Sequence, residues 1–351
     1  MRVLKNLGLI LLVVVLLFAG FIIYSTLTWY DPPKEFVLNQ NTNPDIIPCD
    51  SAMNILSWNI GYAGLGDDMD FFYDGGTRVR DTRQRTLINL DSIHTFLKRN
   101  ALQSFFLIQE IDLHSKRSYY INELDTLTLP GMATNLALNY VVKFVPIPPL
   151  DPMGSVNSGV WSMSRYMPES STRYSYPGKF NWPIRLFNLR RCMLVNRYPT
   201  ANRKEFILIN THMSAFDDGS LKKQEIQFLK DFIQNEYKKG NYVVTGGDWN
   251  QSPPGFPLTQ FGEVYKSESF HLTNIATDFL PAGWKWVYDP QTPSNRYVNE
   301  PYMPGKTSRC ILDIFLVSPN VEVLHNQTFD LKFRNSDHNP IEMSFRLRSH
   351  N

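Results

Sequence analysis

The stretch Asn335–Pro340, NSDHNP, stands directly before the last apolar run of the chain, Ile341–Phe345. An aspartate followed by Asn or Pro is ordinarily a turn former, and a lone histidine is more often structural than catalytic. The Asp337–His338 pair gains meaning from the rest of the chain, because several other apolar runs also end in polar residues that suit metal or acid–base chemistry.

The other polar groups follow short apolar runs of the length typical of β-strands. Ile55–Trp58 ends in an asparagine, Phe105–Ile108 in Gln-Glu, and Phe206–Ile209 in Asn-Thr-His. Tyr242–Thr245 leads into the motif GGDWN, and a further aspartate lies inside the run Ile311–Val317. The acids, amides and histidines at these positions are Asn59, Glu110, His212, Asp248, Asn250, Asp313, Asp337 and His338.

Strands that pack side by side bring such ends onto one rim, so we expect these groups to meet in a single cleft. Burying so many carboxylates and amides is costly without a cation or mutual hydrogen bonds. Oxygen ligands from Asp, Glu and Asn suit Mg²⁺ first, with Mn²⁺ or Ca²⁺ as alternatives, and do not suit zinc. The pattern therefore predicts a divalent-metal site.

The fold class follows from the periodicity of the apolar residues. Thr82–Arg99 and Leu221–Lys239 have the spacing of amphipathic helices. Short β-type runs outnumber them and stand mostly in antiparallel order, which favours a layered sandwich with outer helices over a Rossmann sheet. These runs are Ile55–Trp58, Phe105–Ile108, Tyr140–Val145, Gly159–Met163, Cys192–Asn196, Phe206–Asn210, Tyr242–Thr245, Ile311–Val317 and Ile341–Phe345.

The composition sets further bounds. A chain of 351 residues with 43% apolar residues buries a sizeable core and is not a disordered chain. The net charge is +2 and no long Lys/Arg run occurs, so the sequence does not indicate strong nucleic-acid binding. Four arginines within residues 78–85 either face a phosphate or form the solvated start of a helix; they are Arg78, Arg80, Arg83 and Arg85.

The three cysteines, Cys49, Cys192 and Cys310, are widely spaced and form no zinc motif. The last two lie in apolar runs, which favours buried free thiols. Their number leaves the redox compartment open.

The N-terminal segment predicts a membrane anchor. Leu7–Leu27 has no charge, and about 21 residues at 1.5 Å each span the hydrocarbon core. Basic residues precede it and Trp29 and Tyr30 follow it, as in a helix with a cytoplasmic N-terminus. A cleaved signal peptide is the alternative, but no small-x-small cleavage site precedes Thr28. We expect a cytoplasmic tail at 1–6, an anchor at 7–28, a linker or lead-in arm at 29–50, and an extracytoplasmic catalytic domain at 51–351.

The order of these motifs resembles the endonuclease/exonuclease/phosphatase superfamily, which includes deoxyribonuclease I, abasic-site endonucleases, neutral sphingomyelinases and inositol-polyphosphate 5-phosphatases. The resemblance covers about residues 53–348. It implies a four-layered α/β/β/α sandwich of two packed, mostly antiparallel sheets flanked by helices. The motifs that carry it are SWN (57–59), IQE (108–110), NTH (210–212), GGDWN (246–250), LDIF (312–315) and SDHNP (336–340).

The resemblance also implies roles for single residues. Glu110 is the main metal ligand, with Asn59 beside it and Asp337 joining directly or through water. His338 contacts the scissile phosphate, and Asp313 orients its imidazole. The remaining residues carry the water, the phosphate and the second histidine position: Asp248 and Asn250 orient the attacking water or a phosphate oxygen, His212 matches the deoxyribonuclease branch, and Asn157 lies near a strand that binds substrate. Whether Asp248 or His338 is the general base stays open.

Departures from the family pattern bear on the substrate. Residues 308–314 lack the Asp-Arg pair of the inositol phosphatases, and His212 replaces the tyrosine of abasic endonucleases. Segments 61–85 and 174–191 mix aromatics with arginines, and each forms a substrate wall, a membrane contact or an ordinary surface loop. We expect an enzyme that hydrolyses a phosphodiester in a phospholipid head group or a nucleic acid, with no obligate protein partner. The alternatives are a phosphomonoesterase for a soluble ester and an inactive membrane-anchored binding module.

Overall fold

Two β-sheets lie face to face at the centre of the protein, shown in a computed structural model that describes residues 2–216, 219–266 and 270–348. The first sheet has the order β14 (Val321–Thr328), β15 (Ile341–Leu347), β2 (Met53–Asn59), β3 (Phe105–Asp112), β5 (Gly154–Ser164), β4 (Ala133–Val145). The second has the order β1 (Glu35–Gln40), β6 (Ser170–Ser175), β7 (Cys192–Pro199), β8 (Glu205–His212), β9 (Tyr242–Asp248), β13 (Asp313–Val317), β10 (Lys285–Val287). A separate two-stranded sheet pairs β11 (Asn295–Arg296) with β12 (Arg309–Cys310).

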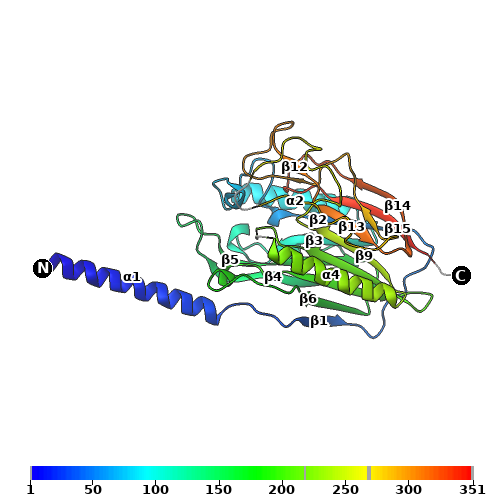
Figure 1. Ribbon diagram of the computed structural model, residues 1–351, viewed down its shortest axis with the longest axis horizontal. Coiled ribbons are helices and arrows are strands. Elements are labelled where there is room, and N and C mark those ends of the chain that lie inside the picture. Colours follow the sequence, from blue (N-terminus) through cyan, green and yellow to red (C-terminus); the bar gives the residue numbers. More distant parts are fainter. Residues whose placement is uncertain (1, 217–218, 267–269, 349–351) are drawn as a thin grey trace.

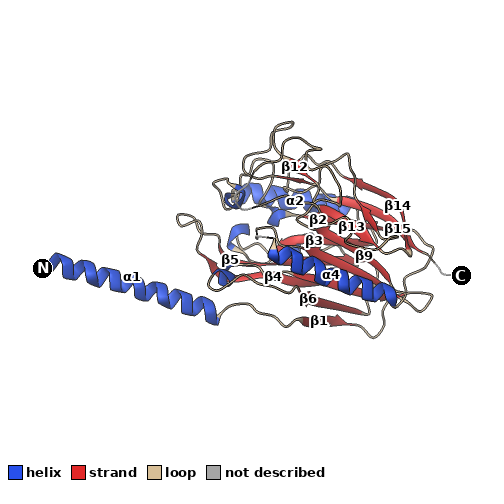
Figure 2. Cartoon of the chain, in the orientation of Figure 1, coloured by secondary structure: helices blue, strands red, loops and turns tan. Residues whose placement is uncertain are grey.

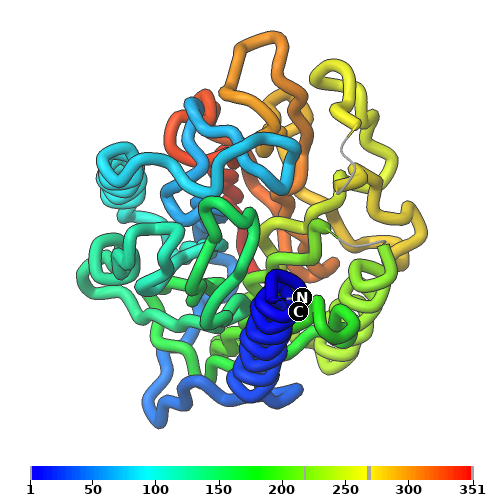
Figure 3. The backbone as a smooth tube through the Cα atoms, turned by 90° about the vertical axis from the view of Figure 1, so that its left-hand side faces the viewer, coloured from blue at the N-terminus to red at the C-terminus, as the bar shows by residue number. Residues whose placement is uncertain are grey.

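The helices lie outside the two large sheets (Figure 2). They are α1 (Arg2–Leu27), α2 (Arg83–Arg99), α3 (Glu123–Leu127) and α4 (Ser220–Lys238), with short 3₁₀ turns η1 (Gly61–Ala63), η2 (Phe72–Asp74), η3 (Lys116–Ser118) and η4 (Ile184–Phe187). The end-on view of Figure 3 places α2 (cyan) and α4 (yellow-green) on opposite sides of the strands. The four-layered sandwich expected from the sequence is therefore confirmed.

Three apolar clusters hold the layers together. Between the sheets, Phe105, Phe206 and Phe345 pack in one buried cluster. Leu90 and its neighbours on α2 cover the outer face of the six-stranded sheet. Leu229 and its neighbours on α4 cover the outer face of the other sheet. The helical period read from the sequence exists because one stripe of each helix must face a sheet.

Each large sheet contains one parallel pair among otherwise antiparallel pairs of described strands: β2 with β3, and β8 with β9. In the first pair Asn59 stands opposite Gln109, and in the second His212 stands opposite Asp248. Because parallel strands end at the same edge, the polar ends of β2, β3, β8 and β9 meet at one end of the sandwich.

Eight of the nine apolar runs expected to be strands lie wholly in strands, and the two expected helices are α2 and α4. The ninth run, Ile311–Val317, begins two residues before β13. The sequence did not indicate β1, β6, β10, β11, β12 or β14. Apart from β6, these strands are two or three residues long or lie at sheet edges, so their residues are less consistently apolar; β14, for example, exposes two of its central residues. β6 has the polar sequence SSTRYS. The three cysteines are free thiols, and Cys192 and Cys310 are buried as expected.

Helix α1 projects away from the sandwich as a separate rod (Figure 1). It is the one helix of the described chain that is long and apolar enough to cross a membrane, and its most apolar stretch is not buried by the rest of the protein. Its C-terminal turns contact the domain, where Phe21 stacks on Phe187 with ring centroids 5.6 Å apart. The helix therefore leaves the sandwich at a defined place.

Candidate active site

The backbone itself directs Glu110 toward the cleft. The pairing of β3 with β5 shifts register between Ile108 and Ile111, and Glu110 lies inside this shift with φ of +56°. A bulge of this kind turns one side chain away from the regular alternation of the strand. Non-glycine residues rarely adopt this conformation, and where they do it often marks a functional position. Asn250, with φ of +49°, has the same strained backbone after β9.

Asn59 connects the acids at the ends of the two sheets. Its Nδ2 group lies 3.3 Å from Oε1 of Glu110 and 3.1 Å from Oδ2 of Asp248. Its Oδ1 atom accepts a hydrogen bond from the backbone N–H of Gly61 at 3.0 Å. In this arrangement Asn59 bridges two carboxylates, and direct ligation of a metal by its oxygen requires the amide to turn over and lose the bond to Gly61.

His338 is held at both ring nitrogens. Its Nδ1–H donates to Oδ2 of Asp313 at 2.7 Å, and Nε2 lies 2.9 Å from the side-chain nitrogen of Asn295. Nε2 also lies 3.7 Å from Asp248 and 3.9 Å from Asp337. Burial lowers the pKa of His338, but the carboxylates of Asp313, Asp337 and Asp248 outweigh it and raise that pKa well above its ordinary value. The side-chain N–H of Asn295 opposes this rise in the His338 pKa, because its hydrogen bond needs an Nε2 atom that carries no proton.

His212 faces the same acids from the other sheet and has the opposite electrostatic setting. Its Nε2 lies 3.4 Å from Asp248 and 3.9 Å from Glu110. Burial, followed by the positive charges of Arg191, His338 and Arg117, lowers the pKa of His212 well below its ordinary value. His212 is therefore a neutral imidazole.

The acids of the cleft are costly to ionise together. Burial and the neighbouring Glu110 raise the pKa of Asp337 to about 7, although His338 acts in the other direction. Burial raises the pKa of Asp248 and brings that of Asp74, on the cleft wall, to about 6. A bound cation would relieve this repulsion between carboxylates.

The donor set fits a hard cation that keeps part of its water shell. Within the described ranges, no group of three or more His, Cys, Asp or Glu side chains is arranged to hold a metal ion. Mg²⁺ is commonly bound by one or two carboxylates with waters in its remaining positions, so a full protein cage is not needed. Glu110, whose side chain is 24% exposed, and Asp337 both line the cleft with carboxylate oxygens.

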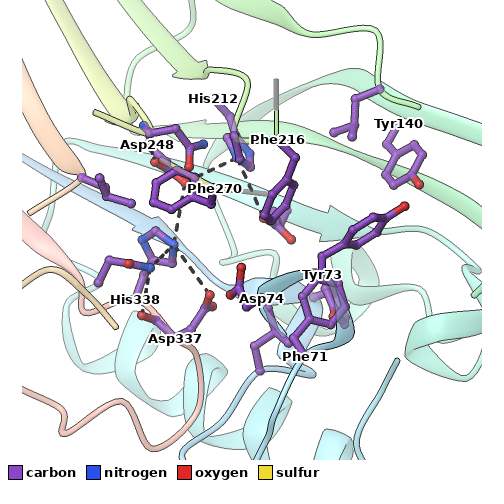
Figure 4. Close-up of a pocket in the computed structure, with 18 of the residues that line it drawn as sticks. Phe71, Tyr73, Asp74, Tyr140, His212, Phe216, Asp248, Phe270, Asp337 and His338 are labelled. Carbon is purple, nitrogen blue, oxygen red and sulfur yellow. Dashed lines mark hydrogen bonds and ion pairs between the residues drawn. The ribbon is translucent and has the colours of Figure 1, made fainter. Parts of the chain in front are cut away.

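Aromatic side chains form the opposite wall of the cleft (Figure 4). Phe71, Tyr73 and Asp74 come from segment 61–85, and Figure 4 shows them across the cleft from His338. Segment 174–191 contributes Asn188, Leu189 and Arg191. Both segments that mix aromatics with arginines in the sequence therefore line the cleft.

Among the cleft residues that the sequence did not indicate are Asn295, Arg191 and Asp74. Asn295 lies on the two-residue strand β11, which forms an isolated bridge with His338 and which no apolar run announces. Arg191 lines the cleft, and its Nη1 atom is buried without a hydrogen-bond partner. A buried guanidinium N–H without a partner is suited to receive an anion such as a phosphate oxygen.

One expected substrate residue, and one of the two alternatives for the arginine cluster, do not lead to the cleft. Asn157 lies in β5 with its backbone N–H bonded to Ser115, and it is not among the residues that line the cleft, whereas its neighbour Ser158 is. The arginines at 78, 80 and 85 pair with aspartates at 70, 151 and 67. These ion pairs favour the structural reading of that cluster over a phosphate contact.

The other predicted residues come together from five strands, β2, β3, β8, β9 and β13, and from two loops. Asn59, Glu110, His212, Asp248, Asp313 and His338 form the chain of contacts described above, and Asn250 supports Asp248 through its backbone N–H at 2.8 Å. Asp337 lies beside His338 on the loop before β15.

A family model described as the endonuclease/exonuclease/phosphatase family matches residues 56–338. The chain belongs to this family. The match begins in β2 and ends at His338, so it encloses every predicted site residue. Members of the family are generally phosphoesterases or nucleases that act on phosphate esters, and they generally use divalent metals.

Solved structures show the same fold at low sequence identity. An endonuclease/exonuclease/phosphatase from Beutenbergia cavernae DSM 12333 has a TM-score of 0.57 and 18% identity, and the match covers 85% of this chain and 72% of that one. D. rerio TDP2, complexed with single-strand DNA product, has a TM-score of 0.53 and 15% identity over 85% of this chain and 100% of its own. ANGEL2, a 2′,3′-cyclic phosphatase, has a TM-score of 0.54 and 16% identity over 91% and 100%. No curated protein matches the sequence.

Proposed function

We propose that the protein is a membrane-anchored, extracytoplasmic phosphodiesterase that depends on a divalent metal, with Mg²⁺ as the first choice. The observation that carries the proposal is the link between two acid–base groups from different sheets: Asn59 bridges Glu110 and Asp248, while Asp248 lies within 4 Å of both His212 and His338. An inactive binding module has no need for such a buried and strained cluster.

Glu110 and Asp337 would hold the metal, with Asn59 beside them. When bound, the cation supplies Lewis-acid stabilisation of charge on the phosphate. The role of the chain is to hold the carboxylates together without the cation, which Asn59 does by donating to two of them. The raised pKa of Asp337, caused first by its burial, is consistent with a site built for a cation.

The two histidines and Asp248 would serve the attacking water and the phosphate. Asp313 fixes Nδ1 of His338, so Nε2 faces the cleft beside Asp248 and Asp337. Once protonated at Nε2, His338 would donate to a non-bridging oxygen of the scissile phosphate and would no longer accept from the amide of Asn295. Asp248, which accepts a hydrogen bond from the backbone N–H of Asn250, would orient the attacking water. Neutral His212 would donate its single N–H to the phosphate.

The N-terminal segment would hold this enzyme at a membrane. Residues 1–6 form the cytoplasmic tail, 7–28 the anchor, and 29–50 the arm that leads to a catalytic domain at 51–351. Within the arm, β1 pairs with β6 at the edge of the seven-stranded sheet, so it is attached to the domain as an added strand.

The test is hydrolysis of an aryl phosphodiester, bis-p-nitrophenyl phosphate, by the purified full chain in detergent. We expect turnover with Mg²⁺ or Mn²⁺, complete loss with EDTA, and recovery when Mg²⁺ is restored. A parallel assay with p-nitrophenyl phosphate separates diesterase from monoesterase activity. Hydrolysis of the monoester alone would replace the proposal with the phosphomonoesterase alternative, and turnover that is indifferent to EDTA would refute the metal dependence.

A further inference from the structure

Two loops beside α1 expose large apolar side chains to the surroundings. Leu150 is fully exposed, Ile147 and Phe144 are each 40% exposed, and Trp182 and Ile184 are each more than half exposed. We call these five residues the α1-side surface. Large apolar side chains exposed on neighbouring surface segments generally mark a protein or membrane contact when they form a patch, and both of these segments lie against α1.

The α1-side surface is attached to α1 itself. Phe21 lies with its ring centroid 6.1 Å from that of Phe144 and stacks on Phe187. The indole N–H of Trp182 donates to Oγ1 of Thr26 at 3.4 Å. The loops therefore run alongside the last turns of the apolar helix and do not merely stand near its end.

These contacts set a depth. Phe21 stands six residues before Leu27, which at 1.5 Å per residue is about 9 Å from the end of the helix. If α1 spans a bilayer and its apolar stretch ends at Leu27, side chains that pack on Phe21 lie about 9 Å inside the boundary of the hydrocarbon core, among the acyl chains. Phe144 and Phe187 lie at that level, and their loops carry the other exposed apolar residues.

Two basic side chains lie farther from the membrane centre than these apolar residues. The guanidinium of Arg185 lies 4.5 Å from the ring centroid of Trp29, and the ammonium of Lys179 lies 5.0 Å from it. Trp29 follows the helix directly, at the position of an interfacial aromatic residue. Lys179 also lies 3.8 Å from Oδ2 of Asp31, whereas Arg185 forms no ion pair with a carboxylate within the described part of the chain. At a membrane surface with anionic lipid head groups, apolar side chains are expected to lie deeper in the bilayer and cations nearer to the water.

The same two segments also build the cleft. Tyr140 and Met153 line the cleft on either side of the exposed loop at 144–150, and Leu189 lines it just after the loop that carries Trp182 and Ile184. Figure 3 looks directly at this end of the molecule, with α1 projecting toward the viewer and the loops beside it. The cleft and the apolar loops thus belong to one end of the sandwich.

We propose that the α1-side surface inserts into the bilayer leaflet that α1 leaves, and so holds the cleft at the level of the lipid head groups. This inference rests on the proposed anchor and phosphodiesterase activity, and it selects a phosphodiester of a lipid head group as the substrate. Hydrolysis would break one P–O ester bond: the oxygen of water bonds to phosphorus, and the leaving alcohol takes up a proton from that water.

Spin-label accessibility tests the insertion without relying on activity. The full chain, with Cys49→Ser to remove the half-buried thiol, carries one label at Leu150→Cys and is reconstituted at low density into phosphatidylcholine–phosphatidylglycerol vesicles. Leu102→Cys is the matched control, because Leu102 is 84% exposed and precedes β3 at the other end of the sandwich. We expect the label at 150 to meet oxygen more often than a water-soluble nickel chelate, and the label at 102 to show the reverse. Equal access of the chelate to both labels would overturn the insertion, as would protection at 150 that disappears on dilution of protein in the bilayer, which would indicate contact between copies.

Activity on vesicles tests the substrate. Leu150→Asp should lower hydrolysis of head-group phosphodiesters in mixed phosphatidylcholine, phosphatidylglycerol and sphingomyelin vesicles by about 10-fold, because a charge replaces a leucine that would lie in the bilayer. Phosphorus NMR follows this hydrolysis. Its turnover of bis-p-nitrophenyl phosphate, which also reports folding, should stay unchanged, and Leu102→Asp should alter neither rate. Cleavage of the aryl diester but of no lipid would refute the substrate. Absence of both activities with a buried label would refute the proposed phosphodiesterase and leave the membrane contact standing.

Discussion

The two ends of the β-sandwich are built on the same strands and differ in almost every physical respect. At one end, β2, β3, β8 and β9 finish in acids, amides and histidines, with the strained backbone of Glu110 and Asn250. Toward the other end, Phe105 begins β3 and Phe206 is the second residue of β8, and their ring centroids lie 5.5 Å apart between the sheets, packed with Tyr198 and Phe345. The difference separates the residues that hold the fold from those that carry the proposed chemistry, and it makes opposite predictions for substitutions at the two ends.

The largest effect is expected at the polar end. His338→Ala removes the proposed phosphate contact and should lower kcat on bis-p-nitrophenyl phosphate by about 10³-fold or more, as loss of a catalytic acid–base or charge-stabilising group does. The thermal midpoint should change little, because the site is not the main source of stability. His325→Ala, at an exposed histidine in β14, is the control. Full activity of His338→Ala would show that the polar end does not carry the proposed catalytic group.

The apolar end should respond in the opposite way. Phe206→Ala leaves a cavity between the sheets and should lower the free energy of unfolding by about 3–5 kcal/mol. Urea denaturation measures this loss, and kcat per folded molecule should remain near that of the parent protein. Phe36→Ala, at a ring that is 51% exposed, should cost far less. A large fall in kcat without destabilisation would show that the two ends are not separable.

Two glutamates outside the site, one buried and one partly exposed, show how burial changes the contribution of an ion pair to stability. Arg197 and Glu236 lie 2.7 Å apart with the Glu236 side chain 4% exposed, and Arg346 and Glu322 lie 2.7 Å apart with Glu322 26% exposed. Burial raises the pKa of Glu236, but hydrogen bonds from Arg197, Lys239 and Asn241 outweigh it and lower that pKa to about 2.

The folded-state pKa of Glu236 is thus below its unfolded value, so its contribution is present above about pH 4.5 and is lost as the pH falls toward 2. We expect Glu236→Gln to lower the free energy of unfolding at pH 7 by about 2–3 kcal/mol, and by much less at pH 3. Glu322→Gln, as the control, should have little effect at either pH. The same loss at both pH values would contradict the assigned cause.

The smallest effect is expected for Asn295, a positioning residue. Asn295→Ala removes the donor to Nε2 of His338 and should lower kcat by about 10-fold, the value of one lost hydrogen bond. Because that donor favours the neutral imidazole, the His338 pKa should rise further and the corresponding limb of the pH–rate profile should move to higher pH.

Asn320→Ala is the matched control for that change, because Asn320 is a buried amide bonded to Asn241 at the edge of the core. It should reduce stability and leave the pH profile in place. A profile that does not move in Asn295→Ala would assign Asn295 a merely structural role.

The sequence predicted that polar residues gather at one end of the sandwich, but it did not predict every residue of the cleft. Runs such as Phe105–Ile108 are continuous and apolar because their strands are buried on both faces, so their ends, and with them Glu110 and Asp248, were readable. Asn295 was not readable, since β11 has two residues and its partner His338 lies on a loop. Asn157 shows the converse limit: strand position alone does not tell which of two adjacent residues, 157 or 158, faces the cleft.

The packing of α1 on the domain was also beyond the sequence. The apolar segment predicted a spanning helix from its own composition, but the contact of Phe21 with Phe144 and Phe187 joins residues more than 120 positions apart. Segments 61–85 and 174–191 were left open between wall, membrane contact and plain loop. The structure places both along the cleft and brings part of the second beside α1.

The most direct measurement is the rate of bis-p-nitrophenyl phosphate hydrolysis as a function of Mg²⁺ concentration, for the parent protein, Glu110→Gln, and Glu169→Gln as an exposed control. We predict saturable activation by Mg²⁺ in the parent protein and in the control. In Glu110→Gln we predict a rate lower by at least about 10²-fold and weaker Mg²⁺ activation, because the proposed metal site loses its main carboxylate. A Glu110→Gln protein with the parent's rate and Mg²⁺ dependence would contradict the central claim that the strand-end cluster is a metal-dependent phosphodiesterase site.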